Sequence, residues 1–377
     1  MIYLDNASTT KPSEGVKKAV IDAMENFGNP SSMHRLGIDS EKIIKNAAEN
    51  VSKVLGVRPE NIYFTSGGTE SNNTAILGYC RKNKKRGTHV ITTKIEHPSV
   101  LEPFKKLEDE GFCVSYIGVD ENGIIKLDEF ENALREDTIF VSCMWVNNET
   151  GSIQPVEKLK NIMKSRSPKA VLHADAVQAF GKIECKPKKY GVDMLSLSAH
   201  KIHGIKGCGA LYVDNVNIDP YIIGGAQQKN MRSGTENVVG IAGLGQAAAE
   251  LNIEKDREYV SALRSLLERG IRENIDDIKI NGEHDNSGYV LNVSFRGVKA
   301  EILLHSLERY DIFVSTGSAC STNKPMPSHV LSAMGCAKRE IDGAVRFSLG
   351  NDLKKEDIYE VVSALKKETA QIRKYVR

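Results

Sequence analysis

The chain has 377 residues, of which 40% are hydrophobic and 27% are charged, as in an ordinary soluble globular protein. This length predicts about two domains, because a single hydrophobic core seldom grows so large. The 51 basic and 49 acidic residues leave a formal net charge of +2, which gives no bulk electrostatic reason to bind nucleic acid or a membrane.

Helical patterns alternate with short β-rich runs from residue 14 to residue 213. Helices are predicted at 14–27, 40–55, 70–82 and 99–110. Strands are predicted at 61–65, 89–93, 113–117, 138–146, 170–174, 194–198 and 210–213. Alternation of this kind predicts an α/β fold in which a mostly parallel seven-stranded sheet is flanked by helices. The run TIFVSCMWV is almost continuously apolar, which is typical of a buried parallel strand.

The pattern changes in the C-terminal third. One long helix is predicted from about Gly240 to Asn274, and short strands such as GYVLNVSF and further helices follow it. We therefore place a domain boundary near residue 255. Residues 12–255 would form a large domain, and residues 1–11 and 256–377 a smaller α+β domain. Ligands in such folds bind beyond the carboxyl ends of the strands, so the strand ends are where we expect chemistry.

The N-terminal sequence MIYLDNASTT lacks the basic start and apolar run of a signal peptide, and no apolar run approaches the roughly 20 residues that span a bilayer. The one basic run, Arg81 to Arg86, is expected to be a solvated loop. The seven cysteines are scattered and never spaced C-x-x-C. This pattern disfavours a disulfide framework or a structural zinc site and favours a reducing cytoplasm.

Polar residues follow the first predicted strands. Gly68 and Thr69, in SGGTESNN, can offer backbone N–H groups and a hydroxyl to a phosphate at a helix N-terminus. His97, in EHPSV, could stack on a flat cofactor or move protons. Asn147 and Asn148, in VNNETG, could donate to a carboxylate or a phenolic oxygen. The alternative for each residue is a purely structural turn or cap.

Two later strand ends carry charged residues. Asp175 follows AVLHA, where a carboxylate is costly unless it is paired, and a protonated pyridine nitrogen would suit it. Gln178 could then reach a ring hydroxyl, although Asp175 could also simply cap the next helix. Lys201, in SLSAHKIHG, could form a Schiff base because partial burial lowers the pKa of a lysine. Ser198 and His200 flank it and could bind phosphate.

The remaining candidates lie nearer the C-terminus. Thr235 lies in the polar loop GGAQQKNMRSGTEN, which suits an anion. Cys320 is surrounded by small residues in STGSACST and has Lys324 nearby, which gives a thiolate access and a positive environment. Arg346, in the strand-like VRFSLG, could hold a substrate carboxylate. Cys336 is expected to be structural.

In this order the motifs resemble the cysteine desulfurase family, within the class V aminotransferase group of fold-type I pyridoxal-phosphate enzymes. The resemblance runs from YLDNASTT to VRFSLG and so covers nearly the whole chain. Its most specific pieces are YLDNASTT, GNPSSMH, FTSGGTESNN, EHPSV, VNNETG, HADAVQ, SLSAHKIHG, RSGTEN and STGSACST.

The resemblance implies an enzyme that uses pyridoxal phosphate to remove sulfur from L-cysteine. The products would be L-alanine and a persulfide on Cys320. Its sulfur would pass to an acceptor or scaffold protein for iron–sulfur cluster assembly, with tRNA thiolation as a second outlet. Thr235 would reach the cofactor phosphate of a neighbouring subunit, which implies a homodimer. The segment from Cys320 to PSHVL resembles the longer active-site loop of the subgroup that serves iron–sulfur assembly.

The resemblance also implies a role for each candidate. Lys201 would hold the cofactor covalently, Cys320 would be the nucleophile, and His97 would stack on the ring and shuttle protons. The residues expected to contact the cofactor are Gly68, Thr69, His97, Asn147, Asp175, Gln178, Ser198, His200, Lys201 and Thr235. The residues expected to bind the substrate carboxylate are Asn147 and Arg346.

Other functions are compatible with parts of this sequence. A selenocysteine lyase, or another class V aminotransferase or lyase, would keep the cofactor, and a degenerate member could serve as a sulfur-carrier partner or scaffold. The string SAHK matches the S-x-x-K motif of some acyl-transfer enzymes, but the companion strings are absent. Zinc binding by His200 and His203 lacks further ligands. Cys208 stands where many relatives carry an aliphatic residue, and we expect it to be a small core residue.

Overall fold

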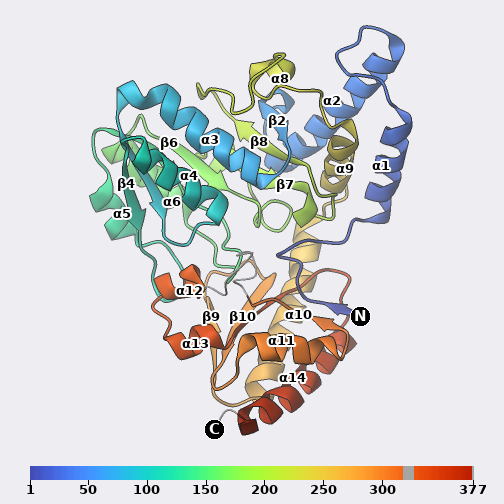
Figure 1. The fold of residues 1–377 in the computed structure, drawn as a ribbon, viewed down its shortest axis with the longest axis vertical. Coiled ribbons are helices and arrows are strands. Elements are labelled where there is room, and N and C mark those ends of the chain that lie inside the picture. Colours follow the sequence, from blue (N-terminus) through green and yellow to red (C-terminus); the bar gives the residue numbers. More distant parts are fainter. Residues whose placement is uncertain (317–326, 376–377) are drawn as a thin grey trace.

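The computed structural model describes residues 1–316 and 327–375, so the predicted nucleophile Cys320 lies outside the described residues. Figure 1 shows a larger upper part, built around a central sheet, and a smaller lower part that contains both ends of the chain. The described chain contains no helix that is both long and apolar enough to cross a membrane.

The central sheet has seven strands in the order β2-β8-β7-β6-β5-β3-β4. Their bounds are β2 Ile62–Thr65, β3 His89–Thr93, β4 Cys113–Ile117, β5 Thr138–Ser142, β6 Val171–Asp175, β7 Met194–Ser198 and β8 Gly209–Val213. Only β8 among the described strands of this sheet runs antiparallel to its neighbours, β2 and β7. The predicted mostly parallel seven-stranded sheet is therefore confirmed.

Both faces of this sheet are buried, because alternate residues of its strands belong to different hydrophobic clusters. Val90 and Phe140 pack with residues of α3 (Gly68–Asn83) and α4 (Pro98–Asp109). Ile91 and Val141 share the other cluster with residues of α2 (Arg35–Leu55), α6 (Val156–Arg166) and α9 (Val238–Ala249). Successive side chains of a strand point to opposite faces, so a sheet covered by helices on both sides needs apolar residues at nearly every position. The other helices of this part are α1 Glu14–Glu25, α5 Leu127–Ala133, α7 Pro187–Tyr190 and α8 Gln227–Asn230.

The lower part has a hydrophobic cluster of its own, which includes Leu4, Val260, Leu291, Phe347 and Leu365. Its antiparallel sheet has the order β12-β10-β9, and β1 (Ile2–Tyr3) pairs in parallel with β11 (Ile312–Phe313). The remaining bounds are α10 Ile253–Asn274, β9 Ile278–Asn281, β10 Val290–Phe295, α11 Ala300–Glu308, α12 His329–Ala333, α13 Lys338–Asp342, β12 Ala344–Ser348 and α14 Lys355–Tyr375. The chain division near residue 255 stays a prediction, which these separate clusters support.

The single long helix predicted from Gly240 to Asn274 is in fact two helices. Helix α9 ends at Ala249 and α10 begins at Ile253. Leu251, between them, packs against the cluster of the central sheet, whereas Val260 on α10 belongs to the lower cluster. The interruption lies where the packing changes from one core to the other.

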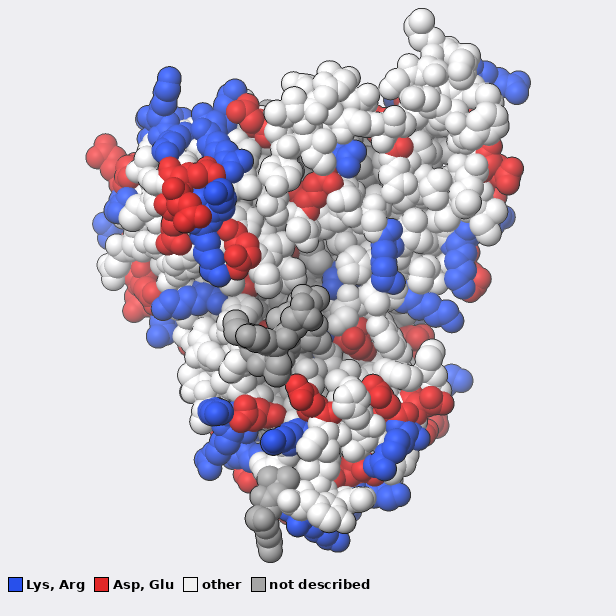
Figure 2. Space-filling view, in the orientation of Figure 1, with Lys and Arg blue, Asp and Glu red and all other residues white. Residues whose placement is uncertain are grey.

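Charged residues of both signs are interspersed on the surface. Figure 2 shows lysine and arginine side chains beside aspartate and glutamate side chains on the face drawn. The basic run predicted as a loop instead ends α3 and forms a 3-10 turn at 84–86. Within it, Arg81 pairs with Glu110 at 2.6 Å and Lys82 with Asp219 at 2.9 Å. Exposed pairs of this kind contribute little to stability.

Candidate active site

A cavity of about 270 Å³ lies at the carboxyl ends of the central strands, where the chemistry was predicted. Nine of the expected residues line it: Gly68, Thr69, His97, Asp175, Gln178, Ser198, His200, Lys201 and Arg346. They come from five separate segments of the chain. Strands of the central sheet bring four of these segments to one edge, and Arg346 comes from β12 of the lower sheet. Their individual roles stay predictions.

The side chain of Lys201 reaches into this cavity from the turn that follows β7. Its Nζ donates to the carbonyl oxygen of Ala7 at 2.5 Å and to that of Ser8 at 2.7 Å. The turn is tight: a Cβ atom on Gly204 would lie 2.8 Å from the carbonyl oxygen of Ala199. The N-terminal segment and the strand end together therefore hold a lysine amine at the cavity.

A buried network surrounds the carboxylate of Asp175, at the end of β6. Its Oδ2 accepts a hydrogen bond from Asn72 Nδ2 at 2.8 Å, and its Oδ1 accepts one from the Val177 amide at 2.9 Å. Asn72 Nδ2 also lies 2.9 Å from Ser99 Oγ, which is 2.8 Å from His97 Nδ1. Asp175 is 5% exposed, so its negative charge is held in a site largely closed to water.

Burial determines the charge of the two histidines in the cavity. It lowers the pKa of His97 below the usual 6.5, against the opposing attraction of Asp175. It also lowers the pKa of His200 to about 4, and the positive charges of Lys201, Lys206 and Lys182 act in the same direction. Both imidazoles are therefore neutral near pH 7, and each ring has one nitrogen without a proton.

The amino end of α3 forms the part of the cavity best suited to an anion. The helix starts at Gly68, and Gly67 before it has a φ of 154°. A Cβ atom on Gly68 would lie 2.6 Å from Val177 Cγ2, so the backbone passes where a side chain would not fit. The first N–H groups of a helix lack intrahelical acceptors and favour anions. Ser198 lies beside this turn and supplies a hydroxyl.

Arg346, on β12, approaches the cavity from the lower part of the molecule. Its Nη2 donates to Asp5 Oδ1 at 2.8 Å and to Ser8 Oγ at 2.7 Å, and its Nη1 donates to the Asn148 carbonyl oxygen at 3.0 Å. The residue is 3% exposed. A guanidinium held in this way offers a fixed cation for a carboxylate.

Two of the expected residues do not line the cavity. The Asn147 side chain is fully buried in its turn: its amide donates to the Ile95 carbonyl oxygen at 3.1 Å, and its Oδ1 accepts from the Glu149 and Thr150 amides. The neighbouring Asn148 lines the cavity instead. Thr235 is exposed on a loop.

The prediction missed two polar residues of the site, Asn72 and Ser99. Both lie within motifs that it had used, namely SGGTESNN and EHPSV. Asn72 falls one helical turn after Gly68, which is a signal that its side chain could face the same site.

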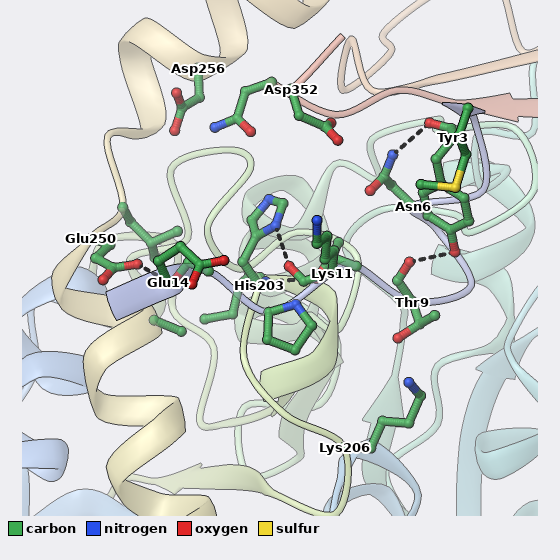
Figure 3. Close-up of a pocket in the computed structure, with 18 residues that line it drawn as sticks. Tyr3, Asn6, Thr9, Lys11, Glu14, His203, Lys206, Glu250, Asp256 and Asp352 are labelled. Atoms are coloured by element: carbon green, nitrogen blue, oxygen red, sulfur yellow. Dashed lines mark hydrogen bonds between the residues drawn. The ribbon is translucent and has the colours of Figure 1, made fainter. Parts of the chain in front are cut away.

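A larger cavity of about 640 Å³ shares the N-terminal segment as a wall (Figure 3). Asn6, Thr9 and Thr10 line it, whereas Ala7 and Ser8 line the smaller cavity. Its charged residues are Lys11, Glu14, Lys206, Glu250, Asp256 and Asp352. Neither Lys201 nor Asp175 lines it, so the smaller cavity is the candidate active site.

Other reactive groups in the described chain are less suited to chemistry. Cys208 is buried, as predicted for a small core residue, and burial raises the pKa of its thiol to about 12. Cys336 is half-buried, and burial likewise raises its pKa. Within residues 1–316 and 327–375, no group of three or more histidine, cysteine or acidic side chains could hold a metal ion.

Comparison with known proteins places the chain in a family. The aminotransferase class-V family model matches residues 2–361. A cysteine desulfurase IscS from Clostridium botulinum is 42% identical, over 97% of this chain and 94% of the relative. The solved structure of a NifS-like protein matches with a TM-score of 0.92 and 38% identity, over 98% of this chain and 99% of that chain. That of SspA in complex with cysteine matches with a TM-score of 0.84 and 34% identity, over 93% and 99%.

These matches extend over nearly the whole chain, and they include the strand ends that form the cavity. They confirm the resemblance inferred from the motifs. The chain belongs to the aminotransferase class-V family and, within it, to the cysteine desulfurases.

Proposed function

We propose that the protein is a pyridoxal-phosphate-dependent cysteine desulfurase that converts L-cysteine to L-alanine and leaves the sulfur as a persulfide on Cys320. One observation carries the proposal: a lysine amine, a buried carboxylate and the N-terminus of a helix line the same small cavity. The cysteine desulfurase relatives, and the neighbour solved with cysteine bound, support the same reaction.

The residues of the cavity fit pyridoxal phosphate. Asp175 is a buried carboxylate for which no ion pair is found in the described chain. A protonated pyridine nitrogen would give this carboxylate a positively charged partner. The first turn of α3, with Gly68, Thr69 and Ser198, suits the phosphate. Lys201 would hold the cofactor, and Gln178 would meet its ring oxygen. When bound, the protonated ring supplies an electron sink for the carbanion at the substrate α-carbon.

The chain's own residues would position the substrate and move its protons. Arg346 would bind the α-carboxylate, with its guanidinium already oriented by Asp5 and Ser8. The amine of Lys201 would take the α-proton and deliver a proton back. His97 is neutral near pH 7, so it could accept a proton from a thiol at the cavity.

Cys320 would receive the sulfur. Its thiolate attacks the sulfur of the substrate, the bond between that sulfur and carbon breaks, and the sulfur remains on Cys320 as a persulfide. The carbon takes up a proton, and alanine leaves. The sulfur then passes to an acceptor or scaffold protein, which we expect to serve iron–sulfur cluster assembly and, as a second outlet, tRNA thiolation.

We also propose a cytoplasmic homodimer. In this dimer, Thr235 would reach the cofactor phosphate of the neighbouring subunit. Thr235 is exposed in this chain and is therefore accessible to a second subunit.

The direct test is to incubate the purified protein with cysteine and a thiol reductant, which releases the persulfide sulfur as sulfide, and to measure alanine and sulfide. The wild type should bind pyridoxal phosphate, turn yellow and release both products. Cys320→Ser should keep the yellow cofactor and release no sulfide. If that variant desulfurates cysteine at the wild-type rate, the role of Cys320 is wrong; if the wild type binds no cofactor, the proposed function is wrong.

A further inference from the structure

Lys182 is a lysine in an unusual place, buried behind the wall of the candidate active site. It is 7% exposed, and its Nζ lies 5.9 Å from the centre of the Tyr289 ring. Its Nζ donates a hydrogen bond to Gln178 Oε1 at 2.8 Å. Within the described chain, no aspartate or glutamate forms an ion pair with it. The positive charge is therefore shared with a neutral amide and an aromatic face.

Through Gln178 this lysine is connected to the reactive amine. Gln178 Nε2 donates to the carbonyl oxygen of Ala7 at 2.8 Å, and the same oxygen accepts from Lys201 Nζ at 2.5 Å. A lysine ammonium has only donors, whereas an amide has a donor end and an acceptor end. The hydrogen bond from Lys182 therefore keeps the amide oxygen of Gln178 pointing toward Lys182 and away from the cavity. The nitrogen has two N–H groups, so one remains for a ligand in the cavity that Gln178 lines.

Stability does not explain a lysine at this position. Burying a cation without a carboxylate partner costs free energy, and an apolar side chain of similar length would avoid that cost. Burial, together with the nearby charges of Lys201 and Arg346, lowers the pKa of Lys182 to about 7. The fold therefore places two lysines and an arginine around one cavity, although only Lys201 and Arg346 line it.

We propose that Lys182 is a positioning residue, which holds Gln178 with its amide nitrogen toward the cavity so that the ring oxygen of the bound cofactor receives an N–H donor. This inference rests on the proposed function, because it needs pyridoxal phosphate in the cavity. Lys182 touches neither the substrate nor the cofactor in this account, and its effect passes through Gln178.

The test is a double-mutant cycle with Lys182→Met, Gln178→Ala and the double variant. Each apoprotein is titrated with pyridoxal phosphate, and its melting temperature is recorded. Lys182→Met should weaken cofactor binding about three- to tenfold, the loss expected for one weakened hydrogen bond. In the double variant, binding should be no weaker than in Gln178→Ala alone. The melting temperature of Lys182→Met should stay level or rise, because a buried unpaired cation is removed.

Lys160→Met is the matched control. The Lys160 side chain is partly buried, but its Nζ pairs with Asp193 at 2.6 Å, and Lys160 does not line the cavity. This variant should lose stability and keep wild-type cofactor affinity. If Lys182→Met does not fold, Lys182→Leu, which also lacks a donor, replaces it in the same cycle.

Two results would overturn the role of Lys182. One is wild-type affinity in Lys182→Met; the other is a double variant whose loss is the product of the single losses, which would mean that Lys182 does not act through Gln178. Failure of the wild-type apoprotein to bind pyridoxal phosphate would instead refute the proposed function itself.

Discussion

Replacing Asn72 by alanine should impair catalysis although this residue was not among the predicted catalytic groups. Asn72 is fully buried and donates one of the two hydrogen bonds found on the Asp175 carboxylate, at 2.8 Å. It also contacts Ser99 Oγ, which lies next to the His97 ring. The substitution therefore weakens the stabilisation of the charge that we expect to keep the cofactor ring protonated.

The expected size follows from that hydrogen bond. A hydrogen bond to a charged group contributes about 1.5–3 kcal/mol, and about 1.4 kcal/mol corresponds to a tenfold change in rate. Asn72→Ala should therefore lower kcat/KM for alanine formation by about 10- to 100-fold when cofactor is saturating.

Initial rates of alanine formation at several cysteine concentrations measure this effect. Asn73→Ala is the control: Asn73 lies next along α3, and the one side-chain hydrogen bond found for it in the described chain is to the Thr69 carbonyl oxygen, at 2.9 Å. It should keep kcat/KM within about twofold of the wild type, as expected for a surface substitution. A folded, cofactor-loaded Asn72→Ala enzyme with wild-type kcat/KM would refute the role given to the Asp175 network.

Two further predictions follow from buried charges. Arg346→Lys should raise KM for cysteine by about tenfold or more, because one ammonium cannot replace the guanidinium contacts to Asp5, Ser8 and a carboxylate; an unchanged KM in steady-state kinetics would contradict this. Burial raises the pKa of Glu96 to about 8 from 4.5, so the folded state keeps a proton that the unfolded state releases. Stability from this group is complete below pH 4.5 and is lost as the pH rises toward 8. The melting temperature of Glu96→Gln, relative to that of the wild type, should accordingly rise between pH 5 and pH 8. If both melting temperatures change equally with pH, the raised pKa of Glu96 is contradicted.

Much of the fold could be predicted because its signals are local. Buried parallel strands leave nearly continuous apolar runs, and the residues just past them, such as Asp175 and Lys201, must meet at one edge of the sheet. The break between α9 and α10 left no such signal, because both helices have ordinary helical sequences. Only the packing of Leu251 and Val260 on different cores shows why the chain turns there.

The site was less predictable where contacts join distant residues. Arg346 meets Asp5 and Ser8, more than 300 positions away, and no local pattern records that contact. Asn147 and Asn148 are the same residue type, so the sequence does not show which side chain faces the cavity. Asn147 Oδ1 accepts a hydrogen bond from the Glu149 amide, two residues ahead, and so stabilises the turn. The side chain left at the cavity is then that of Asn148.

The most direct measurement of the central claim is the mass of the peptide that contains Cys320 after a single turnover. Wild-type enzyme loaded with cofactor is mixed with one equivalent of cysteine, stopped and digested without reductant. We predict the mass of one added sulfur atom on that peptide, and no such addition in Lys201→Ala. Alanine formed in full by the wild type, with no sulfur on Cys320 at any time, would contradict the account.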